Sequence, residues 1–134
     1  MSQEDVRWRQ RFRQFEKAFL LLQEANEIER PSIVERAGLI QFFGMAFELG
    51  WKLLKDFEEA EGFAPKSPRD AIKQAFQASF ISQGHEWLEA LEDRNLTTHT
   101  YNESTAVLVE QKIRSTYFPC LERLYRDFRA RLDG

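Results

Sequence analysis

A chain of 134 residues that is 43% hydrophobic and 31% charged, with few glycines and prolines, has the composition of one globular domain and excludes a disordered protein. The net charge of −3 argues against an extended nucleic-acid-binding surface, so a polyanion would have to bind at a local basic patch. The single cysteine, Cys120, excludes an internal disulfide, and charges interrupt every apolar stretch well before the roughly 20 residues needed to cross a membrane. We therefore expect a cytoplasmic protein with no membrane contact.

Helical patterns account for the first half of the chain. A first helix is predicted over residues 3–29, ended by Pro31. Its apolar positions recur at three- and four-residue steps: Phe12, Phe15, Phe19 and Leu22. Ser32 and Glu35 form a capping-box pattern at the start of a second helix, which should end near Gly62. Because this second helix is apolar nearly all round, we expect it to be the most buried element.

Three further helices are predicted in the second half. Ser67 caps a short third helix that should run to about residue 80, and the residues 82–84 separate it from a fourth. Asn102 or Ser104 then caps a long terminal helix, which Pro119 should kink. The apolar stripe of this helix comprises Val109, Ile113, Tyr117, Leu121, Leu124 and Phe128.

No strand pattern is found, so we predict an all-α fold: an up-and-down antiparallel four-helix bundle with an additional short helix, as a single domain over residues 1–134. Two arginine-rich stretches are candidate phosphate contacts, although solvated helix faces explain them more simply: residues 7–13, and Arg123, Arg126, Arg129 and Arg131. Trp8, which lies in the first stretch, is a candidate stacking platform, whereas Trp51 and Trp87 are assigned to the core or to an interface.

The stretch EDRNLTTHTYNE, residues 92–103, combines polar groups that core packing does not require. On a regular helix Arg94, Thr98 and Tyr101 share one face, whereas His99 lies about 140° round from Arg94. One straight helix therefore cannot direct both groups at a single atom. They converge if the helix unwinds within this stretch, or if two copies of the chain meet across a twofold axis and form a composite site in a homodimer.

These residue types suit RNA cleavage without a metal. His99 can take the proton of a ribose 2′-hydroxyl or protonate the leaving 5′-oxygen, and Arg94 offers a permanently charged fork for the phosphate. Asn95 is placed to orient the imidazole, and Tyr101 to stack on a base or donate to phosphate. Thr98 adds a supporting hydroxyl, although threonine near a helix end more often caps. By spacing alone, a polar and solvated helix end remains the alternative interpretation.

The string RNLTTHTY at residues 94–101 resembles the R-x4-H-x-Y signature of the HEPN superfamily. More narrowly, it is similar to the HepT-type toxins encoded beside a minimal nucleotidyltransferase antitoxin, a group also described as the nucleotidyltransferase substrate-binding protein family. The stretches FELGWKLLKDFEEAEG (47–62) and SPRDAIKQAF (67–76) resemble the second and third helices of that group.

The resemblance implies a dimeric four-helix bundle with the motif in a cleft at the dimer interface, and a metal-independent endoribonuclease that needs no cofactor. Arg94 and His99 would be catalytic, with Asn95 in support. Tyr101 occupies the position to which the partner nucleotidyltransferase adds AMP. The implied partners are a second copy of the chain, the nucleotidyltransferase antitoxin and RNA. Two alternatives stay open: a non-catalytic substrate-binding or docking subunit, and a dimerisation module whose motif only specifies the interface.

Overall fold

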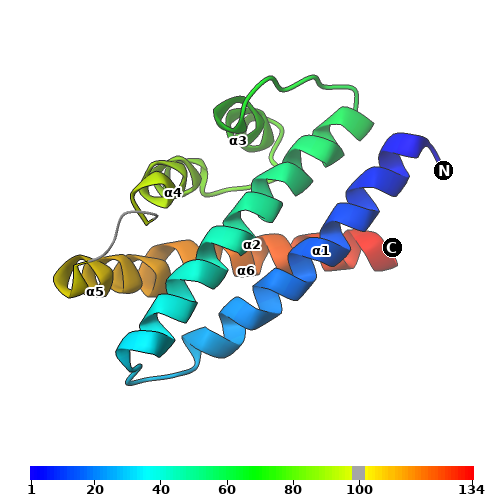
Figure 1. Cartoon of the computed structure of the whole chain (residues 1–134). Coiled ribbons are helices and arrows are strands. Elements are labelled where there is room, and N and C mark those ends of the chain that lie inside the picture. Colours follow the sequence, from blue (N-terminus) through cyan, green and yellow to red (C-terminus); the bar gives the residue numbers. More distant parts are fainter. Residues whose placement is uncertain (98–101) are drawn as a thin grey trace.

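The computed structural model describes residues 1–97 and 102–134, and within these ranges it contains helices and turns but no strand (Figure 1). The predicted all-α class is thus confirmed. The elements in chain order are α1 (Gln3–Asn26), α2 (Ile33–Ala60), α3 (Pro68–Gln77), α4 (Gly84–Thr97), α5 (Glu103–Lys112), the π-helical turn η1 (Ile113–Tyr117) and α6 (Phe118–Asp133). None of the helices in the described part of the chain is long and apolar enough to span a bilayer.

The two longest helices, α1 and α2, pack side by side in opposite directions (Figure 1). The start of α2 follows the predicted capping box, in which Glu35 N–H donates to Ser32 Oγ at 3.1 Å and Ser32 N–H to Glu35 Oε1 at 2.8 Å. Gly62, with a φ of 95°, lies just beyond the end of α2, as the sequence predicts. The apolar stripe of α1 is fully buried: Phe12, Phe15, Phe19 and Leu22.

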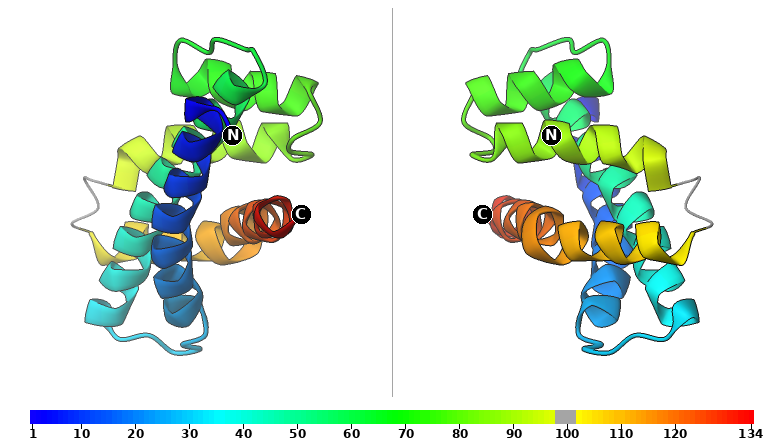
Figure 2. Two further views of the ribbon diagram at one scale, coloured as in Figure 1. Left: turned by 90° about the vertical axis from the view of Figure 1, so that its right-hand side faces the viewer. Right: turned by 90° about the vertical axis from the view of Figure 1, so that its left-hand side faces the viewer.

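The helices α5, η1 and α6 form one continuous rod that crosses α1 and α2 at a wide angle (Figures 1 and 2). Gly50 of α2 lies at this crossing, where an added Cβ would be 3.3 Å from Phe15 Cε1 and 3.4 Å from Leu121 Cδ2. A side chain there would therefore require the neighbouring side chains to shift by a few tenths of an ångström. The up-and-down order of the predicted four-helix bundle and the homodimer stay predictions.

A π-helical turn lies directly before Pro119, where the sequence predicts a kink. Pro119 has no N–H to donate to the carbonyl four residues before it, and its ring would clash with that carbonyl. Just before it, the N–H of Phe118 donates to the oxygen of Ile113, five residues back, so the helix widens for one turn and then continues. The apolar stripe is buried within and after the turn, whereas Val109 before it is partly buried.

The short helices α3 and α4 cover the C-terminal half of α2 (Figures 1 and 2). Asp70 N–H donates to Ser67 Oγ at 3.0 Å, which confirms the predicted cap of α3. This helix ends at Gln77, about three residues earlier than predicted, because Ser79 adopts a φ of 63°. Phe80 N–H then closes the turn on the oxygen of Ala75 at 2.8 Å. Trp87, 1% exposed, anchors α4 to the core.

Trp8 lies in the core. Its side chain is 4% exposed and meets the rings of Phe57 and Phe128 edge to face, with centroids 5.4 and 5.7 Å away. The interpretation of Trp8 as a stacking platform for a ligand is therefore wrong. Helical spacing places it four residues before Phe12, on the buried stripe of α1, and this position outweighs its arginine neighbours.

An ion-pair network fixes the beginning of α5 against α2 and the α1–α2 loop. Arg36 of α2 pairs with Glu103 and donates to Glu110 Oε1 at 2.6 Å. Arg114 donates to Glu110 Oε2 at 2.8 Å and to the carbonyl oxygen of Ile28 at 2.8 Å. Although burial alone would raise the pKa of Glu110, the two arginines outweigh it and lower this pKa. The chain is thus held firmly where it leaves the 94–101 motif.

Candidate active site

The motif of residues 94–101 spans the end of α4 and the connection to α5. Arg94 lies in the last turn of α4, and Asn95 follows it in the same helix. The side chain of Asn95 lies outside the described residues, as do Thr98, His99 and Tyr101 entirely. That these groups converge with Arg94 in one site is therefore a prediction from the sequence.

The guanidinium of Arg94 packs against α2. Its Nη1 forms an ion pair with Glu48 Oε2, and its Cζ lies 6.0 Å from the centroid of the Phe47 ring. The Arg94 side chain is 23% exposed, so it is held by protein on one side and reached by solvent on another. A cation in the last turn of a helix is also favoured by the helix dipole. The site therefore has a fixed positive charge at the protein surface.

Glu48 is a member of this site that the sequence analysis did not identify. Its other oxygen, Oε1, lies 3.5 Å from Lys52 Nζ, one turn further along α2. The three side chains form a row in which a carboxylate separates two cations, with Glu48 at 39% exposure. The i,i+4 spacing of Glu48 and Lys52 can be read in the sequence. The contact with Arg94 cannot, because 46 residues separate the two partners.

Two further contacts tie the end of α4 to the terminal rod. Asp93, next to Arg94, accepts a hydrogen bond from the hydroxyl of Tyr117 in η1. Tyr117 is 1% exposed, and burial, with the carboxylate of Asp93, raises the pKa of its phenol. Lys112 at the end of α5 lies 3.1 Å from Glu89 of α4. The backbone is therefore anchored immediately before the motif, on a face of α4 different from that of Arg94.

After the motif, Asn102 caps α5. Its Oδ1 accepts from the N–H of Ser104 at 2.8 Å and from the Ser104 hydroxyl at 2.5 Å. Of the two predicted caps, Asn102 is thus the correct one. A hollow of about 420 Å³ lies between the end of α4 and α5, with Asp93, Thr105, Leu108, Val109, Gln111, Lys112 and Ser115 around it. It offers space for a small group next to Asp93.

The other basic stretches are occupied by pairs within the protein. In α1, Arg11 donates to Asp56 at 2.9 Å, and Arg7 lies 3.7 Å from Glu59. In α6 the distances are 3.3 Å for Arg123–Asp127, 3.5 Å for Arg126–Glu122 and 3.3 Å for Arg129–Glu16. The interpretation of these stretches as solvated, paired helix faces therefore fits better than that of a phosphate site.

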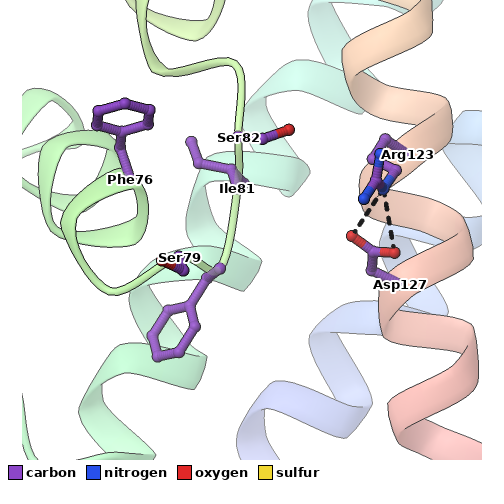
Figure 3. A pocket seen from close by; sticks show the side chains of 7 residues that line it. Phe76, Ser79, Ile81, Ser82, Arg123 and Asp127 are labelled. Atoms are coloured by element: carbon purple, nitrogen blue, oxygen red, sulfur yellow. Dashed lines mark hydrogen bonds and ion pairs between the residues drawn. The ribbon is translucent and has the colours of Figure 1, made fainter.

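A second hollow, of about 300 Å³, lies between α6 and the α3–α4 loop. Figure 3 shows Phe76, Ser79, Ile81 and Ser82 on one side of it and the Arg123–Asp127 pair on the other. Asp127 balances the charge of Arg123 in this hollow. In the described ranges, no group of three or more histidine, cysteine or acidic side chains is placed to hold a metal ion.

Comparisons with known proteins agree with this architecture. The family described as "Nucleotidyltransferase substrate binding protein like" matches residues 10–130. The chain is 27% identical over 111 residues to "Probable ribonuclease HepT" of Haemophilus influenzae, a match that covers 76% of each protein.

Two solved structures are similar over nearly the whole chain. A protein from Thermus thermophilus is 35% identical, with a TM-score of 0.75 over 90% of this chain and 99% of that one. A chain from a mutant MntA–HepT toxin–antitoxin structure has a TM-score of 0.74 at 12% identity, over 92% of this chain and 97% of that one. The second likeness concerns the fold alone.

Proposed function

This chain belongs to the HepT-like HEPN family, also described as nucleotidyltransferase substrate binding protein like, and on that premise we propose that it is a metal-independent endoribonuclease and the toxin of a toxin–antitoxin pair. The observation that carries the proposal is the motif RNLTTHTY, whose Arg94 presents a fixed guanidinium at the surface end of α4. The relative named as a ribonuclease supports it.

In the proposed reaction a ribose 2′-hydroxyl loses its proton to His99, and its oxygen attacks the neighbouring phosphorus. The bond from phosphorus to the 5′-oxygen breaks, and this oxygen receives a proton. The products are a 2′,3′-cyclic phosphate and a 5′-hydroxyl. Arg94 stabilises the negative charge that grows on the phosphate oxygens in the transition state. Asn95 orients the imidazole, and Thr98 contributes a supporting hydroxyl.

A homodimer gives this mechanism its second proton-transfer group. A straight helix continued through residue 99 would direct Arg94 and His99 about 140° apart, so we propose that two copies meet at the motif and place the arginine of one beside the histidine of the other. One histidine can then act as the base and its twin as the acid. The prediction is an isologous interface that includes the ends of both α4 helices.

Neutralisation is proposed to act on Tyr101. A partner nucleotidyltransferase would transfer AMP from ATP to the phenolic oxygen, with pyrophosphate as the leaving group. The added nucleotide carries bulk and a negative charge into the region where the RNA phosphate binds. It therefore repels and blocks the substrate.

Expression in a host cell tests this function. Wild-type protein should arrest growth, whereas Arg94→Ala or His99→Ala should not, although both variants fold and accumulate. Co-expression of the partner nucleotidyltransferase should restore growth, and a Tyr101→Phe toxin should escape that rescue. Equal toxicity of the parent and the alanine variants would contradict the proposal.

A second candidate is a non-catalytic subunit that presents a substrate to a nucleotidyltransferase. The description of the matching family as substrate binding protein like favours it. In that case the protein would co-purify with the nucleotidyltransferase and cleave no RNA. His99→Ala would then change neither growth nor association with the partner.

A further inference from the structure

Glu48 is an unusual neighbour for a phosphate-binding arginine. Its carboxylate pairs with Arg94 across the α2–α4 contact, in a site where the proposed function requires the binding of an anion. A negative charge beside a phosphodiester opposes RNA binding. A carboxylate in this place therefore needs a compensating role.

Two roles are possible on electrostatic grounds. As a latch, Glu48 would occupy Arg94 until RNA displaced it, and its removal would raise activity. As a support, Glu48 would hold the guanidinium in one orientation, and its removal would lower the rate of the chemical step. The two roles predict opposite effects on turnover, so experiment can separate them.

The geometry favours a support. Both carboxylate oxygens of Glu48 have a cation beside them, since Oε2 pairs with Arg94 and Oε1 lies 3.5 Å from Lys52 Nζ, and the preceding residue, Phe47, packs in the core at 1% exposure. The ring of Phe47 contacts that of Trp87 in α4 with centroids 5.4 Å apart, which fixes the distance between the two helices. The pair therefore joins two helices whose spacing is set by core packing, and a carboxylate presented by one of them defines the direction of the guanidinium it binds.

We propose that Glu48 is a positioning residue for Arg94, and that the carboxylate of α2 orients the guanidinium toward the scissile phosphate. This inference rests on the proposed function. Lys52 contributes to the same arrangement, because its positive charge offsets the negative charge of Glu48 and so limits the repulsion between Glu48 and the RNA. The Glu48 carboxylate weakens the binding of the RNA somewhat, but it places the positive charge of Arg94 correctly for the transition state.

The test measures cleavage of a fluorophore-labelled, mixed-sequence RNA oligonucleotide by purified full-length protein. Glu48→Gln and Glu48→Ala should each lower kcat by about 10- to 100-fold, because a misdirected guanidinium no longer matches the transition state. KM should stay the same or fall, since a negative charge near the RNA is gone. Glu48→Asp, which keeps the charge, should recover part of kcat. Glu59→Gln is the matched control, since Glu59 is another ion-paired carboxylate of α2.

A double-mutant cycle asks whether Glu48 acts through Arg94. In an Arg94→Ala background, Glu48→Gln should have no further effect on kcat, and the shifts of the unfolding midpoint should be non-additive. A rise of kcat in Glu48→Gln, or equal losses in Glu48→Gln and Glu59→Gln, overturns the proposal.

Failure of the proposed function gives a different result. If wild-type protein cleaves no RNA, that function is lost, and the unfolding cycle alone judges the pairing of Glu48 with Arg94. If the midpoint shifts of the two single variants do not add up to that of the double variant, Glu48 holds the guanidinium of Arg94. If they do add up, the proposed interaction between Glu48 and Arg94 is overturned.

Discussion

Glu58, in the last turn of α2, links the packing of the helices to pH. Its side chain has no solvent exposure, and neither carboxyl oxygen has a hydrogen-bond partner among the described residues. Burial, with a smaller contribution from the charge of Glu59, raises the pKa of the Glu58 carboxyl to about 8. The folded protein therefore keeps this group largely neutral at pH 7, whereas the unfolded chain ionises it above about pH 4.5.

The free energy of unfolding should consequently fall as the pH rises. Between about pH 4.5 and pH 8 the unfolded chain has released a proton that the folded protein retains. One such proton corresponds to a slope of about 1.4 kcal/mol per pH unit. Glu58→Gln substitutes an uncharged side chain of the same shape and removes this titration. The free energy of unfolding of the variant, relative to that of wild type, should rise with each pH unit. This difference should stop growing above about pH 8.

Urea unfolding followed by helical circular dichroism, in one-unit steps from about pH 5 to about pH 10, measures this difference. Glu61→Gln is the control, because it makes the same change at an exposed carboxylate just beyond the same helix. The free energy of unfolding of Glu61→Gln should change with pH in parallel with that of wild type. If Glu58→Gln also runs parallel to wild type, the carboxyl is not neutral in the folded protein and the reasoning from burial is refuted.

Three other substitutions test the packing. Gly84→Ala should cost about 1–3 kcal/mol in urea unfolding, because an added Cβ would lie 2.7 Å from Phe76 Cγ, and Phe76→Ala in the same chain should remove most of this cost. Tyr117→Phe should cost about 1–3 kcal/mol in thermal unfolding, since Asp93 loses its hydroxyl donor in a part-buried site. Trp8→Ala should cost about 3–5 kcal/mol in urea unfolding, yet the folded fraction should cleave RNA at the wild-type rate.

Each of these has a clear contrary result. Equal costs of Gly84→Ala with and without Phe76 would mean that the ring is not the obstacle. An unchanged midpoint in Tyr117→Phe would mean that the bond to Asp93 contributes no net stability. Loss of RNA cleavage by folded Trp8→Ala protein would restore Trp8 as a ligand contact.

The helices could be predicted wherever the signal lies within a few neighbouring residues. The Ser32–Glu35 capping box, the cap at Ser67 and the left-handed Gly62 each depend on local backbone geometry, and all three are confirmed. Pro119 predicted a disturbance of the terminal helix for a local reason too. That the disturbance is a π-helical turn depends on how the rod packs, and the local sequence does not specify it.

Features that depend on contacts between distant segments could not be predicted. Arg94 was identified from its motif, but its partner Glu48 lies 46 residues away and looks like an ordinary helix-surface residue. Glu58 appears equally ordinary in the sequence, and only the packing of the other helices on α2 buries it. The arginines beside Trp8 suggest a surface position, whereas its four-residue spacing from Phe12 indicates the buried stripe on which it lies. The roles of the motif residues that lie outside the described ranges stay predictions.

The central claim is that Arg94 and His99 cleave RNA without a metal. Single-turnover cleavage of a labelled RNA oligonucleotide, with EDTA present throughout, tests it most directly. Wild-type protein should cut and leave a 2′,3′-cyclic phosphate, while Arg94→Ala and His99→Ala, with unchanged circular dichroism, should each be at least about 100-fold slower. Cleavage by His99→Ala at the wild-type rate, or loss of wild-type cleavage in EDTA, would contradict the claim.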